Sequence, residues 1–292
     1  MLNFIKSIYS SYFLNEIKSI TRIVAYKCLM KTIWIIYKFK FSKKLKSTRH
    51  YIEKLRSEIN KEKKSVFVFA NGPSIADIDL QKIKELCSTG KFDLITINSY
   101  LSNSADQATP RFAVFADNSH LTNPVGQYKK DIDKCKELGI NYFVPAKYAD
   151  DSDINRHAYC GLCDLNSKNT SNILKPAGYY GVTAFFALSL AKMLGYKSIY
   201  ICGFDNSYFL DFEVENNGNM IIKHKHYYDK EINETKVKCL YKSSSQFFFD
   251  VYRHFSFLEK ITNSSENIIN IAKKTYLSTI KRNFELDVYK NE

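Results

Sequence analysis

The stretch KSVFVFANGPS, residues 64–74, carries an unalternating apolar run that leads directly into a turn. A short run without polar alternation, such as Val66–Ala70, is typical of a strand that is buried on both faces. The NGPS sequence that follows predicts a sharp turn in which Gly72 takes a positive φ and Ser74 caps the next helix. The stretch alone is an ordinary strand–turn–helix unit, but its backbone N–H groups would also suit an anion.

The same alternation of strand and helix continues along the chain. We expect strands at Val66–Ala70, Leu94–Asn98, Phe112–Ala116, Asn141–Pro145, Ser198–Cys202 and Ile268–Ile271. We expect helices at Ile75–Cys87, Tyr128–Leu138, Val182–Leu194 and Ser245–Ile261. This order predicts an α/β fold with a mostly parallel sheet flanked by helices. Residues 146–176 and 206–244 are polar, and we expect irregular structure there, with the second stretch acting as an active-site loop or lid.

Polar residues follow four of the expected strands at the point where each strand ends. In open α/β sheets ligands bind beyond the carboxyl ends of the strands, so these residues are the candidate site. They are Asn71-Gly72-Pro73-Ser74, Asn98-Ser99, Asp117-Asn118-Ser119-His120 and Gly203-Phe204-Asp205. The set contains no Lys or Arg and the chain has no GxxxxGK[ST] motif, which favours recognition of sugar hydroxyls and a base over a triphosphate.

The positive charge of the chain is concentrated at its N-terminal end. The net charge is +13, and residues 1–64 hold 16 Lys/Arg against 4 Glu, which leaves the remaining residues almost neutral. A nucleic-acid partner is therefore not expected. Residues 22–46 are basic, apolar and aromatic, but lysines interrupt them too often for a membrane-spanning helix. We expect a basic amphipathic helical extension, residues 1–62, that lies on an anionic membrane surface through residues 1–60; the alternative is a helix packed on the body, residues 63–292.

Cysteine and carboxylate patterns give no metal site. The seven cysteines are scattered and no signal peptide is recognisable, which predicts a reduced, cytoplasmic compartment. Cys160 and Cys163, with His157 nearby, lack the fourth ligand that zinc needs. The Asp-x-Asp pairs at 77–79, 131–133 and 151–153 do not follow buried strands, so we interpret them as helix caps and surface charge.

The chain resembles the bacterial sialyltransferases of glycosyltransferase family 42 and the related MptE-like domain. The resemblance lies in NGPS after the first strand, Asn98 after the second, the segment from Gly181 to Asp205, and His226-Tyr227 downstream. It covers residues 65 to about 281 and leaves out the N-terminal extension. It implies a GT-A-type variant of the Rossmann-like fold, which uses a CMP-activated sugar as co-substrate with no cofactor and no required metal.

The resemblance also implies roles for individual residues. By position, the donor-binding residues would be Asn71, Gly72, Ser74, Asn98, Asp117, Gly181 and Asp205. Tyr208 would donate a hydrogen bond to the departing phosphate. Tyr180 stands where the family usually has Ser, and Asp117 where it often has Asn, so Kdo or another nonulosonic acid is as credible a donor sugar as sialic acid.

Histidine is the residue type best matched to activating an acceptor hydroxyl at neutral pH. The family resemblance makes His226 the expected base and His224 the reserve, while His120 would contact donor or acceptor. Without the resemblance, we would interpret His224 and His226 as solvent-exposed residues of a loop. The leading hypothesis is a glycosyltransferase, peripheral on the inner face of the cell membrane, that glycosylates a cell-surface glycan or lipid-linked acceptor. The alternatives are an MptE-like pterin diphosphokinase that uses ATP and Mg²⁺, and a non-catalytic membrane adaptor. Homo-oligomerisation stays open.

Overall fold

The computed structural model divides the chain into two compact units, Met1–Lys43 and Lys44–Glu292. In the first unit residues 24–40 are helical, and in the part of the chain that the structure describes no helix is both long and apolar enough to cross a membrane. The described residues are 24–103, 108–117, 121–122, 126–150, 152–164, 167–178, 182–223, 236–238, 243–263 and 267–283.

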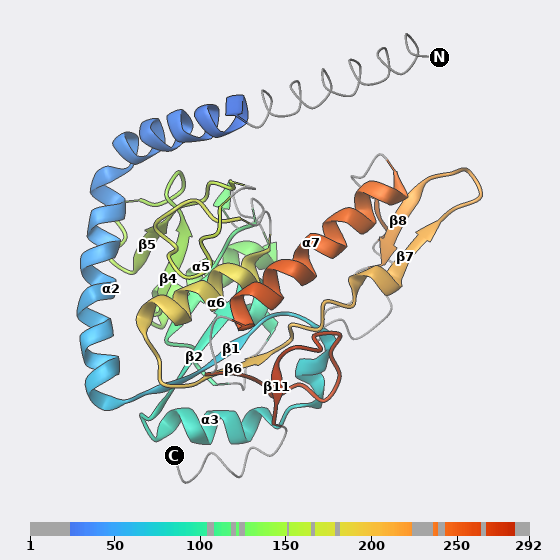
Figure 1. Cartoon of the computed structure of the whole chain (residues 1–292). Helices are drawn as coiled ribbons and strands as arrows, with labels where there is room; N and C mark the ends of the chain where they lie inside the picture. The colour runs from blue at the N-terminus through green and yellow to red at the C-terminus, as the bar shows by residue number, and fades with distance from the viewer. Residues whose placement is uncertain are drawn as a thin grey trace. The chain divides into compact units, whose positions relative to one another are not determined.

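The second unit is built on an eight-stranded sheet flanked by helices (Figure 1). The strand order is β11-β10-β6-β1-β2-β3-β4-β5, and every neighbouring pair is parallel. The strands are β1 (Ser65–Phe69), β2 (Phe92–Ile97), β3 (Phe112–Val114), β4 (Asn141–Pro145), β5 (Arg156–Tyr159), β6 (Ile199–Cys202), β10 (Ile268–Asn270) and β11 (Lys281–Arg282). The predicted α/β fold with a mostly parallel sheet is confirmed, and the chain reverses its direction of travel across the sheet between β1 and β6.

The centre of the sheet is apolar on both faces, as the opening stretch predicts. All five residues of β1 are buried, and Phe67 packs against Phe92 of β2 and Tyr200 of β6, with ring centroids 5.3 and 5.5 Å apart. Helix α6 (Thr183–Leu194) is buried along most of its length, and Gly195 ends it in the left-handed conformation, φ 80°, as expected of a C-cap. In Figure 1, α3 (Leu80–Ser88) lies below the sheet, and α6 and α7 (Ser244–Asn263) lie above it.

Helix α2 (Ser42–Glu62) packs on the sheet, so the compact unit begins at Lys44 and not at residue 63. The sequence analysis placed this segment in the extension because its exposed faces are basic. Its buried side chains nevertheless recur at helical spacing, at Leu45, Thr48, Ile52, Leu55 and Ile59.

Two polar contacts fix the register of α2 on the edge strand β5. The Tyr51 ring stacks on His157, with centroids 3.9 Å apart, and the Thr48 hydroxyl accepts a hydrogen bond from Ala158 N–H at 2.9 Å. Burial lowers the pKa of His157 to about 4, so the ring is neutral near pH 7, and its Nε2–H donates to Asn141 Oδ1 over 2.9 Å.

The two polar stretches that were expected to be irregular both contain strands. Within 146–176 the chain forms β5, and within 206–244 it forms η3 (Tyr208–Asp211) and a small antiparallel sheet of β7 (Phe212–Val214), β8 (Met220–Lys223) and β9 (Lys236–Lys238). Ile222 of β8 forms a separate core cluster with Phe247 and Val251 of α7. The Asn216-Asn217-Gly218 sequence between β7 and β8 is a hairpin signal, and Gly218 has a φ of 81°.

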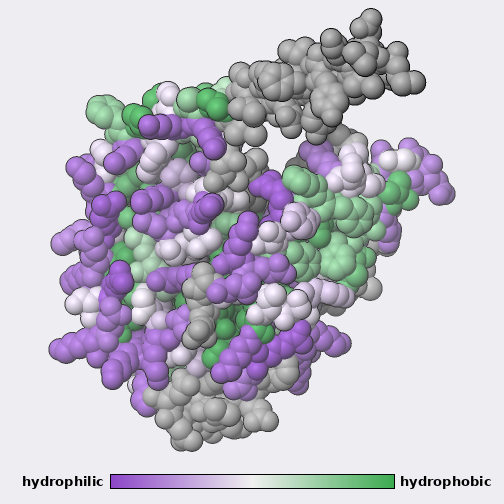
Figure 2. Space-filling model, in the orientation of Figure 1, coloured by the Kyte–Doolittle hydropathy of each residue, from purple (hydrophilic) through white to green (hydrophobic). Residues whose placement is uncertain are grey.

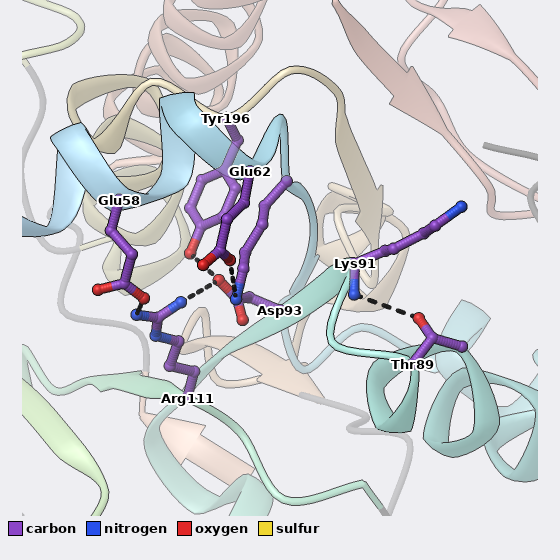
Figure 3. Close-up of polar contacts among 8 residues, drawn as sticks. Glu58, Glu62, Thr89, Lys91, Asp93, Arg111 and Tyr196 are labelled. Atoms are coloured by element: carbon purple, nitrogen blue, oxygen red, sulfur yellow. Dashed lines mark hydrogen bonds and ion pairs between the residues drawn. The ribbon is translucent and has the colours of Figure 1, made fainter.

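A polar network joins α2 to the amino ends of β2 and β3 (Figure 3). Asp93 is only 8% exposed and accepts hydrogen bonds from Arg111 Nη1 at 2.8 Å and from the Tyr196 hydroxyl at 2.7 Å. The other arm of Arg111 reaches Glu58 of α2 at 2.8 Å. The buried carboxylate therefore has a charged partner and a neutral partner at this edge of the sheet.

Replacing Arg111 with Ala is expected to lower the free energy of unfolding by about 3 kcal/mol, because it leaves the buried Asp93 carboxylate without its cation. Urea unfolding measures the loss. The control is Glu58→Ala, which removes the more exposed partner and should cost less than about 1 kcal/mol. Equal, small losses in both variants would mean that the pair with Asp93 does not stabilise the fold.

Candidate functional site

The residues that follow β1, β2, β3 and β6 meet at one edge of the sheet. These four strands are adjacent and parallel, so their carboxyl ends lie together. Among the residues predicted for the site, those described here at this edge are Asn71, Gly72, Ser74, Asn98, Asp117 and Asp205. The site expected from the sequence is therefore brought together by the sheet topology, at the position where ligands bind in open α/β folds.

The loop after β1 and the loop after β6 are bonded to each other. Gly72 N–H donates to the Gly203 carbonyl at 3.0 Å, and Ser74 N–H donates to Asp205 Oδ2 at 2.9 Å. In the reverse direction, Gly203 N–H donates to the Ser74 hydroxyl at 3.2 Å. These three bonds hold the two loops of the topological switch point as one rigid piece.

Two glycines are needed here, for two different reasons. Gly72 has a φ of −67°, so the expected positive φ is wrong. A Cβ at Gly72 would instead lie 2.2 Å from Asp205 Oδ2 and 2.5 Å from the Gly203 carbonyl oxygen, which only glycine avoids. Gly203 does take a positive φ, 74°, and a Cβ there would lie 2.7 Å from the Ala70 carbonyl oxygen.

Ser74 does not cap a helix, contrary to expectation. It lies inside the short 3₁₀ helix η1 (Pro73–Asp77), which has no side-chain cap, and its hydroxyl accepts from Gly203 instead. The cap of the following helix α3 is Asp79, whose Oδ1 accepts from Lys82 N–H at 3.0 Å. The serine is thus part of the contact between the β1 and β6 loops.

Asn98 connects three elements at the carboxyl end of β2. Its Nδ2 donates to Asp117 Oδ2 at 2.8 Å and to the Thr183 hydroxyl at 3.2 Å. Asn98 has a φ of 42°, a left-handed conformation that asparagine tolerates better than most residues. Thr183, the first residue of α6, was missed by the sequence analysis; the only signal was its place just after the expected start of that helix.

Five buried side-chain atoms among the described residues have no hydrogen-bond partner, and all five lie at the carboxyl ends of parallel strands. They are Asn71 Oδ1, Asn98 Oδ1, Asp205 Oδ1, Asn206 Nδ2 and Asn270 Nδ2. They follow or end β1, β2, β6 and β10, which are neighbours in the sheet. An unpaired buried polar atom costs about 1–3 kcal/mol, so a cluster of five indicates groups that a ligand satisfies.

The chemistry of this cluster is mixed: three oxygens accept and two amide nitrogens donate. Asp205 is 5% exposed, and burial raises the pKa of its carboxyl, while hydrogen bonds from Ser74 oppose that rise. Asn206, the next residue, has a φ of 52°. A ligand that presents hydroxyl or amino groups to the oxygens and an acceptor to the amides would satisfy the set.

Tyr208 follows the β6 loop and begins η3. Its hydroxyl lies 2.7 Å from His254 Nδ1 of α7, and its ring packs edge-on against Phe247 at 5.9 Å. The sequence analysis did not name His254 as a candidate. It falls inside the expected helix Ser245–Ile261, and in the structure α7 places it against Tyr208.

An apolar surface lies next to Tyr208. Figure 2 shows hydrophobic side chains gathered over α7 and the neighbouring β7. Exposed members of this surface are Leu210, Val214, Phe248, Phe249 and Tyr252.

The predicted base His226 lies outside the described residues, as do Gly181, His224 and His120. The residues described contain no group of three or more His, Cys, Asp or Glu side chains arranged to hold a metal. Of the Asp-x-Asp residues, Asp79 is a helix cap as expected. Asp131, expected at the surface, is fully buried and accepts from Ser102 N–H at 2.8 Å.

Comparisons of the chain with protein-family models, with curated proteins and with solved structures found no match.

Gly72→Ala is expected to lower the melting temperature and to break the Ser74–Asp205 contact, since the added methyl must displace a carboxylate or a backbone carbonyl. The cost of such overpacking is about 1–3 kcal/mol or more. Calorimetry measures the stability, and the Ser74 amide resonance reports the contact. Gly90→Ala is the control: it adds a methyl in open space at a positive φ, 77°, so it carries backbone strain alone. If the Ser74 amide responds equally in both variants, the crowding at Gly72 is not what fixes the loops.

Proposed function

We propose that this protein is a membrane-surface glycosyltransferase that transfers sialic acid, Kdo or a similar nonulosonic acid from a CMP-activated donor to a cell-surface glycan or lipid-linked acceptor. The observation that carries the proposal is the cluster of five unpartnered buried atoms at the ends of β1, β2, β6 and β10. Hydroxyls and an amino-bearing base are the groups that three acceptors and two donors would bind, and a cytidine nucleotide has both.

The charge of the site supports a nucleoside monophosphate rather than a triphosphate. The described residues that follow β1, β2, β3 and β6 (70–79, 98–103, 115–117 and 203–211) include no Lys or Arg. A CMP leaving group carries a single phosphate, whose charge backbone N–H groups and a tyrosine hydroxyl can stabilise. Tyr208, at the start of η3 after β6, is proposed for that role, and the fold would then be the GT-A-type variant that the sequence resemblance implies.

The acceptor side of the proposal rests on two features. The apolar surface formed by Leu210, Val214, Phe248, Phe249 and Tyr252 lies next to Tyr208 and suits the lipid part of a glycolipid. His226, between β8 and β9 in the sequence, is proposed as the base that activates the acceptor hydroxyl, with His224 as reserve.

The N-terminal unit is proposed to hold the enzyme on an anionic membrane. Residues 1–43 contain eight Lys/Arg and one Glu. The side chains of Val24, Leu29, Ile35, Ile36 and Phe39 in its helix are exposed. A basic helix with exposed apolar and aromatic residues is typical of an interfacial helix.

CMP is expected to raise the melting temperature without added metal, because ligand at 100 times its dissociation constant stabilises the folded state by about 2.7 kcal/mol. ATP with Mg²⁺ should have no such effect. If ATP with Mg²⁺ stabilises the protein and CMP does not, the site belongs to a kinase of the MptE-like kind. If neither ligand stabilises it, the result favours the non-catalytic membrane adaptor.

Two substitutions, one in the candidate site and one far from it, show whether the CMP-induced shift in melting temperature arises at this site. Asn71→Ala removes an unpartnered oxygen, so the ligand-free protein should keep its melting temperature or gain a little, while the CMP-induced shift falls. Asn155→Ala, before β5 at the opposite edge of the sheet, should leave the CMP shift unchanged.

Removing residues 1–41 is expected to yield a folded protein that no longer sediments with vesicles containing phosphatidylserine, since each Lys or Arg near such a surface contributes about 1 kcal/mol. Co-sedimentation and circular dichroism measure binding and folding. The matched deletion of residues 1–60 should lower the unfolding temperature sharply, because it removes the buried face of α2. Unchanged vesicle binding after the shorter deletion would exclude this unit as the anchor.

A further inference from the structure

His254 is a polar partner of Tyr208. The proposed function assigns to Tyr208 the binding of the departing phosphate. His254 Nδ1 lies 2.7 Å from the Tyr208 hydroxyl. Three elements meet at this contact, because the edge of the His254 ring packs on Phe185 of α6 at 5.9 Å and the Tyr208 ring packs on Phe247 of α7. Tyr208 lies three residues beyond Asp205, in the segment that follows β6.

The hydroxyl of Tyr208 has a hydrogen-bond partner in His254, whereas its ring has apolar neighbours. The tyrosine ring belongs to the apolar cluster of Ile222, Phe247 and Val251, which fixes the plane of the ring. Apolar contacts do not orient an O–H bond, which rotates to suit its hydrogen-bond partners. The imidazole ring itself packs against Phe185, which limits the positions that its Nδ1 can take.

The surroundings of His254 favour its neutral form. Burial lowers its pKa; Asp250 opposes this and Arg253 adds to it, and these two residues pair with each other at 3.4 Å. From α6 the ring faces the uncharged Phe185, and from η3 it faces Tyr208. A neutral imidazole either donates or accepts at Nδ1, depending on its tautomer.

We propose that His254 is a positioning residue: its Nδ1–H donates to the Tyr208 oxygen, so that the Tyr208 O–H points to the leaving phosphate of the nucleotide donor. The inference rests on the proposed function, in which Tyr208 binds that phosphate. No proton is transferred in this arrangement. The chain of two hydrogen bonds, imidazole to phenol to phosphate, strengthens as charge grows on the phosphate, because each bond polarises the next.

The test measures CMP release from CMP-N-acetylneuraminate and from CMP-Kdo without an acceptor, which isolates departure of the leaving group from the acceptor's base. His254→Phe keeps the ring and removes the nitrogen, and should slow release roughly tenfold, the worth of one neutral hydrogen bond. His254→Asn places an amide near the position of Nδ1 and should recover most of that loss. CMP affinity and melting temperature, measured alongside, should change little.

A double-mutant cycle separates action through Tyr208 from any other role. In the Tyr208→Phe background there is no hydroxyl to orient, so adding His254→Phe should cost nothing further. If the double variant is slower than Tyr208→Phe by the full single-variant factor, His254 acts independently and the inference is wrong. Unchanged release by His254→Phe, or a failure of His254→Asn to recover, overturns it as well.

These outcomes are distinct from a failure of the proposed function. If the wild-type protein neither binds CMP nor releases it from either donor, the glycosyltransferase proposal fails and the inference falls with it. If the wild type releases CMP but the cycle is additive, only the role of His254 is lost.

Discussion

The contact between the loops after β1 and β6 sets the geometry of the candidate site. Three hydrogen bonds and a missing Cβ at Gly72 bring the two backbones together at the point where the chain changes direction across the sheet. Because both loops continue strands that are buried at the centre of the sheet, their positions are fixed by the packing of the core. The unpartnered atoms of Asn71, Asp205 and Asn206 therefore lie on loops whose positions the core fixes.

Buried polar groups at the amino ends of the strands differ from those at the carboxyl ends in whether they have hydrogen-bond partners. At the amino ends, Asp93 has both Arg111 and Tyr196 as partners, and Arg111 also reaches α2. At the carboxyl ends, buried oxygens and amides are left open. Unpaired buried groups lower the stability of the fold, and the pairing at the amino ends avoids that cost for Asp93.

The N-terminal region has two different physical roles, although its sequence is basic throughout. In α2 the lysines lie around a buried stripe from Leu45 to Ile59, and that stripe joins the helix to the sheet. In residues 24–40 the apolar side chains of Leu29, Ile36 and Phe39 are exposed. Basic composition alone did not separate a helix that packs on its own domain from one whose apolar side chains are exposed.

The sequence by itself determined the α/β class, the positions of the central strands along the chain and the fact that polar residues gather at their carboxyl ends. It did so because unalternating apolar runs have few alternatives to buried parallel strands, and because their carboxyl ends must share an edge. β4 has the bounds that were expected, Asn141–Pro145. The short strands β5, β7, β8, β9 and β11 were not recognised, since runs of two to four residues that include polar side chains, such as Arg156 and His157 in β5, lack the apolar pattern of a buried strand.

Only the tertiary structure decided what each site residue does. Gly72 is required for close approach to Asp205 and not for its φ, and Ser74 bonds a distant loop and not its own helix. The pairing of Tyr208 with His254, 46 residues apart, depends on where α7 crosses the β6 loop. Contacts of this kind arise from the packing of separate elements, and local sequence carries no record of a partner that only the folded chain brings within hydrogen-bond distance.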